Sequence, residues 1–465
     1  MDVSVPPTVP RLVCRSRPYE HFVLNDVHLF DPGTGLDRRG SLEVRDGLIA
    51  ALGPVVSSGE TDTPGGEISP DDPRVITGFE GCHVFPGFVD MHAHLRTPGQ
   101  EYKEDLVSAA EAALAGGFVL LVGMANTVPA VDTGPLATWI LDEAERSADV
   151  MVGQVGALSR GLDGVELAEL RELATAGVAA FSDDGRPVND LDLLRIALRY
   201  LRATGRSVLL HLEDPTLSVD GVVHEGAWSA RLGLRGIPAA AETGPMARDL
   251  ELLRALASEP GGAPRLHFQH LSTAGAVRLL RGARADGLPV TAEVTPHHLL
   301  LGDEKLQSFD QSLKINPPLR TAADRAALTA ALQDGTVDCV ATDHAPHAPH
   351  EKEVPFEDAP FGTVGLETAF AVLYGGLVRS GGLSLARLVD ALSGAPCRCL
   401  GLEPPRLEVG AAANLCVVDL REEWTVGSAD LRGKSRNSAF LGERASGRVL
   451  LTVVRGARRF QRDRA

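Results

Sequence analysis

An alternation of short apolar runs with helical patterns, which begins after Val84, constrains the fold of this 465-residue chain more than any other feature. Helical segments rich in Ala, Leu and Arg follow β-like runs at residues 105–117, 164–176, 190–204, 242–258 and 273–286. This alternation is typical of parallel sheets, because a crossover helix must connect successive parallel strands. So many units in series favour an α/β barrel, and we predict a (β/α)8 barrel over residues 85–403.

Both ends of the chain have a different, β-rich texture. Apolar runs occur at residues 22–24 and 41–45, and again at 414–420 and 449–454. Neither end has enough strands to bury a stable core alone. We therefore expect residues 1–84 and 404–465 to form one composite β-sandwich. Residues 57–73, which are rich in Ser, Gly, Pro and acidic residues, are expected to form a solvated loop.

Composition and charge exclude several classes of partner. The formal net charge of −17 would repel nucleic acids and anionic membranes. No window is apolar enough to span a bilayer, and the N-terminus has no signal-peptide pattern.

The cysteines are scattered, at positions 14, 82, 339, 397, 399 and 416, without paired CxxC motifs. We expect reduced, buried thiols and a cytoplasmic protein.

The first candidate site is a His-x-His pair at the end of the apolar run 88–95. Side chains alternate between the two faces of a strand, so His92 and His94 should project from the same side. Two imidazoles on one side can bind one divalent ion. For an isolated pair, two hydrogen-bonded core histidines are an equally good interpretation.

Other metal-ligand residues follow later apolar runs of the barrel region. They are Asp183 and Asp184, His211, His270 and Asp343. Functional residues of a parallel barrel lie where strands end, so these side chains should meet. His267 and His270 are three residues apart, so they should lie on opposite faces of a strand and only one should face the barrel axis. His270 is the better candidate for a metal ligand, because it stands at the end of the strand. Four histidines and two aspartates suit a borderline ion such as Zn²⁺.

Nine segments of the barrel region resemble the amidohydrolase superfamily, and within it the type I dihydroorotases. They include FVDMHAHLR, FSDDG and VDCVATDHAPH, and span residues 88–106, 123–132, 181–185, 211–214, 267–273, 292–301, 314–320, 337–347 and 359–368. The resemblance implies a distorted (β/α)8 TIM-like barrel with a composite sandwich. It also implies reversible zinc-dependent cyclisation of N-carbamoyl-L-aspartate to L-dihydroorotate, a step of pyrimidine synthesis.

The resemblance also implies a ligand set. His92 and His94 would bind one ion together with Asp343, and His211 and His270 would bind a second. Many members place a carboxylated lysine between the ions, whereas this chain offers Asp184 or, as the alternative, Asp183. One or two zinc ions per chain are therefore expected.

Two further roles concern proton transfer and substrate binding. Asp343 would act as base and then as acid. Arg96 lies two residues beyond His94, where a continuing strand would point it into the same cavity, and its planar fork matches the substrate carboxylate. A surface salt bridge is the alternative for Arg96. The resemblance implies further substrate contacts from His94, Asn126, Asn316, His347, Phe361 and Gly362.

Three alternatives stay open at this point. A hydantoinase or allantoinase would lack the pair Arg96 and Asn126, which suits a carboxylated substrate. A scaffold subunit of aspartate transcarbamoylase would have lost the metal histidines, which are intact here. The third alternative is a subunit with an intact site that is active only in complex with that transcarbamoylase. We expect a homodimer or homo-oligomer with a small-molecule substrate.

Overall fold

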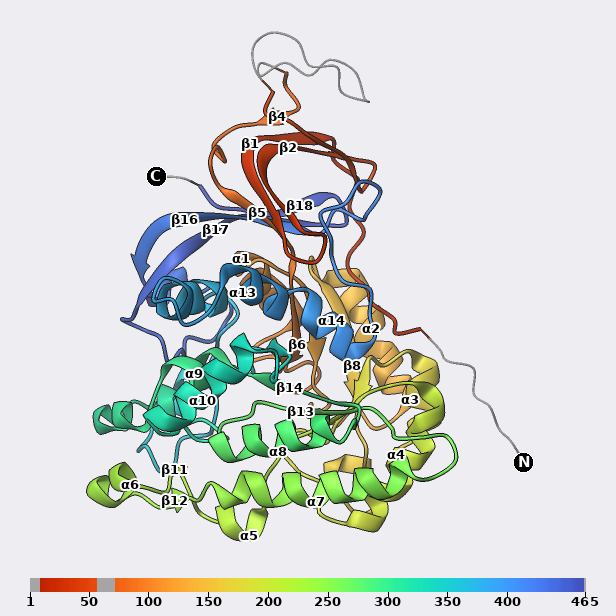
Figure 1. Cartoon of the computed structure of the whole chain (residues 1–465), viewed down its shortest axis with the longest axis vertical. Helices are drawn as coiled ribbons and strands as arrows, with labels where there is room; N and C mark the ends of the chain where they lie inside the picture. The colour runs from red at the N-terminus through yellow and green to blue at the C-terminus, as the bar shows by residue number, and fades with distance from the viewer. Residues whose placement is uncertain (1–8, 57–71, 464–465) are drawn as a thin grey trace.

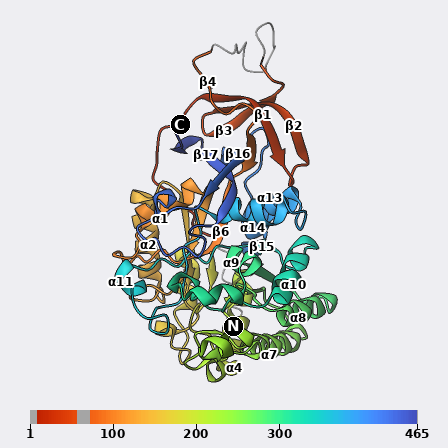
Figure 2. The same cartoon turned by 90° about the vertical axis from the view of Figure 1, so that its left-hand side faces the viewer.

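The computed structural model describes residues 9–56 and 72–463, and it contains a barrel and a second, β-rich lobe (Figure 1). The rotated view places the strands of both chain ends above the barrel (Figure 2). Most of the expected loop 57–73 lies outside the described residues, as do residues 1–8 and 464–465. No helix in the described ranges is long and apolar enough to cross a membrane.

Eight parallel strands form the barrel, in the order β15-β14-β13-β10-β9-β8-β7-β6. Their bounds are β6 Phe88–Ala93, β7 Phe118–Gly123, β8 Met151–Gly156, β9 Ala180–Phe181, β10 Val208–Leu210, β13 Leu266–Phe268, β14 Val290–Val294 and β15 Cys339–Val340. A bridge between Ala93 and His344 brings the first strand beside the end of the last. The amide of His94 donates to the His344 carbonyl at 2.9 Å and so nearly closes the ring. The predicted barrel fold is confirmed.

Helices cover the strands, which explains why the strands are apolar throughout. Strand β7, with the sequence FVLLVG, is buried along its whole length, as expected where both faces of a parallel sheet are covered. The helices are α1 Leu106–Ala115, α2 Gly134–Ser147, α3 Leu170–Ala176, α4 Leu191–Leu201, α5 Pro215–Ser218, α6 Ala227–Leu232, α7 Ala240–Ala257, α8 Ala274–Ala285, α9 Pro296–Leu300, α10 Ala322–Gln333, α11 Pro349–Lys352, α12 Ala369–Leu373, α13 Leu385–Leu392 and α14 Gly394–Leu400. A small parallel pair, β11 Val223–His224 and β12 Gly236–Ile237, lies outside the barrel sheet.

Helix starts follow from local capping chemistry. Asp105, Asp190 and Thr321 each accept backbone N–H bonds at the start of a helix. The helix predicted over 164–176 begins only at Leu170, because residues 159 and 167 form a β-bridge before it. The periodicity therefore located this helix but not its start.

Both chain ends contribute to one eight-stranded sheet, as the composite lobe requires. It consists of β1 Phe22–Asp31, β2 Leu36–Arg45, β3 Leu48–Gly53, β4 Val75–Ile76, β5 His83–Pro86, β16 Leu415–Thr425, β17 Arg444–Val454 and β18 Ala457–Gln461. Strand β5 joins the two ends, because it pairs with both β1 and β16. The expected domain boundary between residues 84 and 85 falls inside β5, whereas the first barrel strand begins at Phe88.

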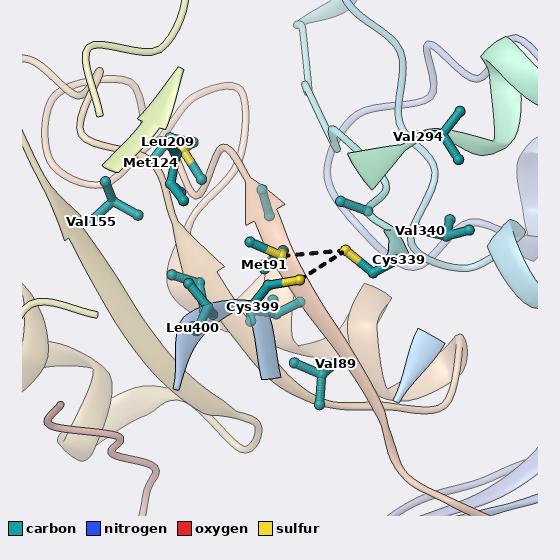
Figure 3. Close-up of a cluster of buried hydrophobic side chains, with 14 of the residues drawn as sticks. Val89, Met91, Met124, Val155, Leu209, Val294, Cys339, Val340, Cys399 and Leu400 are labelled. Atoms are coloured by element: carbon teal, nitrogen blue, oxygen red, sulfur yellow. Dashed lines mark hydrogen bonds between the residues drawn. The ribbon is translucent and has the colours of Figure 1, made fainter. Parts of the chain in front are cut away.

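The barrel interior contains sulfur as well as hydrocarbon (Figure 3). Met91, Cys339 and Cys399 lie beside Val89 and Leu400, all of them buried. Helix α14 packs against β6 and β15 and carries Cys399 into this region. All six cysteines are buried, and none of them forms a disulfide in the described part of the chain.

Candidate metal-dependent active site

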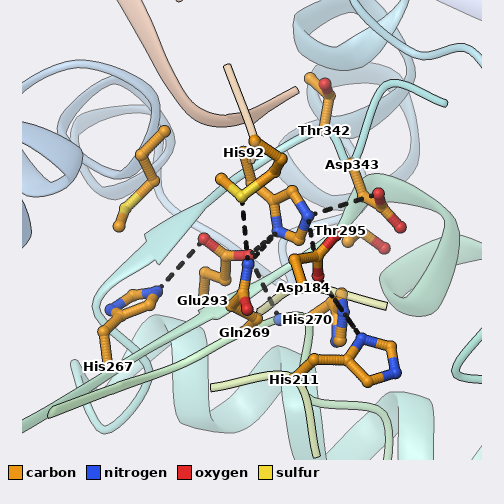
Figure 4. A network of polar contacts seen from close by, with 12 residues as sticks. His92, Asp184, His211, His267, Gln269, His270, Glu293, Thr295, Thr342 and Asp343 are labelled. Carbon is orange, nitrogen blue, oxygen red and sulfur yellow. Dashed lines mark hydrogen bonds and ion pairs between the residues drawn. The ribbon is translucent and has the colours of Figure 1, made fainter. Parts of the chain in front are cut away.

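The six expected metal ligands meet at the ends of five barrel strands, and Figure 4 shows five of them, all except His94. His92 lies in β6, His94 follows β6, Asp184 follows β9, His211 follows β10, His270 follows β13 and Asp343 follows β15. All six residues are less than a tenth exposed. The topology thus brings together residues that are up to 251 positions apart, from His92 to Asp343.

Asp184 lies in the middle of the four histidines. Its Oδ1 is 3.5 Å from His92 Nε2, 3.5 Å from His211 Nδ1 and 3.7 Å from His270 Nε2. Its Oδ2 is 3.6 Å from His94 Nε2. Burial alone would raise the pKa of Asp184, but the surrounding imidazoles hold it well below its usual range. A carboxylate in this position can contact two ions at once.

Asp183 occupies a different environment, although it is adjacent in sequence. Its carboxylate accepts the backbone N–H of Leu158 at 2.7 Å and the backbone N–H and hydroxyl of Ser159. Burial raises the pKa of Asp183 to about 6. These bonds fix the loop after β8 (Met151–Gly156), and they turn Asp183 away from the histidines.

Asp343 faces the His92–His94 pair from the neighbouring strand end, because the chain after β15 (Cys339–Val340) runs beside the end of β6 (Phe88–Ala93). His94 Nε2 lies 3.1 Å from Asp343 Oδ1, and His92 Nε2 lies 3.6 Å from the same oxygen. Burial would raise the pKa of Asp343, yet His92 and His94 hold it below its usual range. The carboxylate is therefore ionised at neutral pH and can accept a proton.

Backbone strain marks three positions of the site. Arg96, His270 and Asp343 have φ values of 59°, 32° and 47°. Side chains other than glycine rarely adopt this left-handed region, and such outliers concentrate at functional sites. Strand β6 ends at Ala93, so the expected continuing strand to Arg96 is wrong. The left-handed turn, and not strand alternation, directs this arginine.

His211 and His270 form the second half of the cluster. His211 Nδ1 and His270 Nε2 are 2.9 Å apart, and His211 Nε2 lies 3.1 Å from Glu213 Oε2. Burial would lower the pKa of His211, but Asp184 and Glu213 raise it to about 9. Asn316 donates to the same Glu213 oxygen at 2.9 Å. Glu213 thus orients a candidate ligand and holds Asn316 at the site.

Sequence reasoning missed Glu293 and Gln269. Glu293 is fully buried in β14 (Val290–Val294), and its Oε1 lies 2.6 Å from His92 Nδ1. Gln269 Nε2 lies 3.2 Å from the same His92 nitrogen. Such partners orient a metal-binding imidazole so that its other nitrogen points at the ion. The one signal in the sequence was an acidic residue inside the apolar run VTAEV.

The donor set fits a divalent cation. The donor atoms of His92, Asp184 and His270 lie within 4.8 Å of one another, and so do those of His92, His94 and Asp343. Three buried atoms of these six residues have no hydrogen-bond partner among the described residues, namely His92 Nε2, Asp184 Oδ1 and His270 Nδ1. Buried polar atoms are normally satisfied, and a bound cation would satisfy ligands of this kind. Imidazole and carboxylate donors suit Zn²⁺ and neighbouring divalent ions.

A cavity of about 250 Å³ opens onto this cluster. Its lining comprises His94, Arg96, Asn126, Asp184, Gly185, His211, His270, Asn316, Asp343, Ala345, His347, Phe361 and Gly362. Every residue expected to contact the substrate is in this set. Burial lowers the pKa of Arg96 to about 10, so its guanidinium still carries its charge at neutral pH. Arg96 Nε donates to the Pro346 carbonyl at 3.2 Å, which leaves the terminal nitrogens to face the cavity.

Asn126 and His347 also lie at the cavity wall. Asn126 Oδ1 is 2.9 Å from His94 Nδ1, so the amide orients a candidate ligand as well as lining the cavity. His347 Nε2 lies 2.8 Å from the Phe361 carbonyl, and this contact occupies its Nε2–H. Burial lowers the pKa of His347 to about 3, so the ring is neutral. A carboxylate would have to share this one N–H with Phe361.

His297 and His298, the other histidine pair of the chain, belong to the short helix α9 (Pro296–Leu300). His298 contacts the Thr295 hydroxyl at 2.8 Å and the Pro317 carbonyl at 2.8 Å, which accounts for it as local structure. Burial lowers the pKa of His297 to about 4. Both rings are buried and neutral beside the charged cluster.

Sequence comparisons place the chain among known proteins. The model of the amidohydrolase family matches residues 83–458. A curated dihydroorotase from Anaeromyxobacter dehalogenans is 46% identical over 439 residues, which cover 94% of this chain and 97% of the relative. A dihydroorotase from Citrifermentans bemidjiense is 42% identical over 428 residues, covering 92% of this chain and 96% of the relative.

A structural comparison supports the fold. The L-hydantoinase (dihydropyrimidinase) from Arthrobacter aurescens superposes with a TM-score of 0.81 at 23% identity. The match covers 95% of this chain and 96% of that structure. At this identity the likeness concerns the barrel and its accessory lobe, and not the substrate.

Proposed function

We propose that this chain, which belongs to the amidohydrolase family, is a metal-dependent dihydroorotase. It would interconvert N-carbamoyl-L-aspartate and L-dihydroorotate plus water. The observation that carries the proposal is Arg96, a charged guanidinium in the cavity wall beside a cluster of metal-ligand residues. Both substrates have a carboxylate that does not react, and a guanidinium fork binds such a group with two parallel bonds.

We propose Zn²⁺ as the ion, with His92, His94 and Asp343 as ligands of one position and His211 and His270 as ligands of the other. Asp184 would contact both, because its two oxygens face different histidines. A divalent ion in such a site polarises a carbonyl oxygen and lowers the pKa of water. Imidazole and carboxylate ligands suit zinc, and the three unpartnered atoms are the natural contacts.

Asp343 would move the proton. In ring opening it accepts a proton from the attacking water and returns it to the ring nitrogen as the amide bond breaks. In ring closure it accepts the proton of the ureido nitrogen, which forms the new bond to the side-chain carboxyl carbon as water leaves. The neighbouring imidazoles lower its pKa, so the carboxylate is ionised before the reaction and has a free lone pair for the proton.

The remaining cavity residues would position the substrate. Arg96 and Asn126 would bind the carboxylate, and Asn316 would contact the ring edge from its place beside Glu213. The backbone of Phe361 and Gly362 would complete the wall. His94 would serve as ligand and cavity wall at once.

Substrate preference tests the proposal. Zinc-loaded protein should hydrolyse L-dihydroorotate with a higher kcat/KM than hydantoin or allantoin, which lack the carboxylate. Preference for either uncharged ring would overturn it. The complete ligand set favours activity of the isolated chain. Activity that appears only when aspartate transcarbamoylase is added would assign the chain to a complex instead, and size-exclusion chromatography would test the expected homo-oligomer.

A further inference from the structure

A second group of metal-ligand side chains lies behind the active-site cluster. His267 comes from β13 (Leu266–Phe268), Glu293 from β14 (Val290–Val294), Cys339 from β15 (Cys339–Val340) and Cys399 from α14 (Gly394–Leu400). All four are at most 2% exposed. Figure 4 shows His267 directed at Glu293, and Figure 3 shows the two cysteines directed at each other. Four separate elements thus supply a nitrogen, a carboxylate and two sulfurs to one buried region.

Two distances between these donors match tetrahedral coordination. The sulfurs of Cys339 and Cys399 are 4.0 Å apart, and His267 Nε2 is 3.2 Å from Glu293 Oε2. Zinc bonds of about 2.3 Å to sulfur and about 2.0–2.1 Å to nitrogen and oxygen would place two sulfurs about 3.8 Å apart, and a nitrogen and an oxygen about 3.3 Å apart. The donors of His267, Glu293 and Cys339 lie within 4.8 Å of one another, and His267 also contacts Cys399.

We propose that His267, Glu293, Cys339 and Cys399 bind one further divalent ion of the zinc class, separate from the active-site ions. The mixed donor set favours a borderline ion such as Zn²⁺ over Mg²⁺ or Ca²⁺, which prefer oxygen ligands. Binding removes the thiol protons of both cysteines and the proton between His267 and Glu293, and these protons pass to solvent. Two thiolates and one divalent cation then cancel, so the site keeps the charge of the Glu293 carboxylate.

Neighbouring side chains hold these four donors in place. His267 Nδ1 lies 2.8 Å from the Thr291 hydroxyl, which holds the ring with Nε2 toward the other donors. Met91 Sδ lies 3.6 Å from Cys339 Sγ and adds a polarisable neighbour. Glu293 contacts His92 Nδ1 through Oε1 and His267 through Oε2. The ion would therefore fix the carboxylate that orients an active-site ligand.

Cobalt substitution distinguishes this site from the active site. The proposed active-site ligands are all nitrogen and oxygen, so only an ion at the new site gives a thiolate-to-cobalt charge-transfer band. Protein expressed in minimal medium with Co²⁺ should show this band. The band should fall to background in Cys339→Ala and in Cys399→Ala. It should persist in the matched control Cys397→Ala, because Cys397 is equally buried on the same helix. Persistence in both test variants, or loss in the control, would overturn the proposal.

A measurement on the unaltered protein covers the case in which the variants do not fold. X-ray absorption of the zinc-loaded chain should contain a sulfur shell at about 2.3 Å. A zinc environment of nitrogen and oxygen alone would refute the site. Neither measurement uses dihydroorotate turnover, so the new site and the proposed reaction can fail independently.

Discussion

Replacement of Arg96 by methionine tests how the site selects its substrate. Methionine keeps much of the apolar stem but removes the guanidinium. The Nε–H is already bonded to Pro346, so a substrate carboxylate would bind the two terminal nitrogens. Each charged hydrogen bond contributes about 1.5–3 kcal/mol, so the loss of two costs about 3–6 kcal/mol. That corresponds to a fall in kcat/KM for dihydroorotate of about 10²–10⁴-fold.

The assay compares two rings with and without the carboxylate. Arg96→Met should lose kcat/KM on L-dihydroorotate but keep its low rate on dihydrouracil, the same ring without that group. Arg96→Lys keeps one bond and the charge, so its loss should be smaller, about 10–150-fold. Melting temperature should not fall, because burial already disfavours the charge of Arg96 and lowers its pKa to about 10. Equal losses on both rings would refute the assignment of Arg96 to the carboxylate.

Three further experiments, with four variants, probe proton transfer, metal binding and pH dependence. Asp343→Asn should lower kcat by about 10²–10⁴-fold or more, and near-normal turnover would contradict its role. Asp184→Asn should lower the number of metal ions per chain in elemental analysis. Asp183→Asn should leave the metal content unchanged and lower the free energy of unfolding by about 1–3 kcal/mol, because Asp183 bonds the backbone and not the ion. Equal metal loss in both variants would contradict the assignment of Asp184 as the ligand. Burial lowers the pKa of Lys352 from its ordinary 10.5 to about 7 in the folded chain. Between pH 7 and 10.5 this lysine is therefore protonated in the unfolded chain but neutral in the folded one. Stability should therefore rise with pH from 7 toward 10.5 relative to Lys352→Met, and parallel melting profiles would refute this.

The sequence predicted the barrel and the meeting of its strand ends, because both follow from periodicity and topology. His92 and Asp343 are 251 positions apart, yet parallel strands bring their ends to one edge. The sequence could not choose between Asp183 and Asp184, because the turn after β9 (Ala180–Phe181) decides which carboxylate faces the histidines. The structure directs Asp184 to them and Asp183 to Ser159.

Two other features depended on backbone geometry that periodicity does not encode. Arg96 reaches the cavity through a residue with φ of 59°, not through a continuing strand. Glu293 was missed because one acid in an apolar run does not reveal which neighbour it meets, and here that neighbour is His92. The contact between Cys399 and Cys339 likewise could not be predicted, because periodicity does not show where helix α14 packs against the barrel strands.

Metal content measured together with dihydroorotate hydrolysis tests the central claim most directly. The purified chain would be assayed as isolated, after chelation, and after stepwise return of Zn²⁺. The account predicts that chelation abolishes turnover, and that turnover returns as the ion fills the cluster around Asp184. Full dihydroorotate hydrolysis by metal-free protein, or no hydrolysis by the fully zinc-loaded chain, would contradict it.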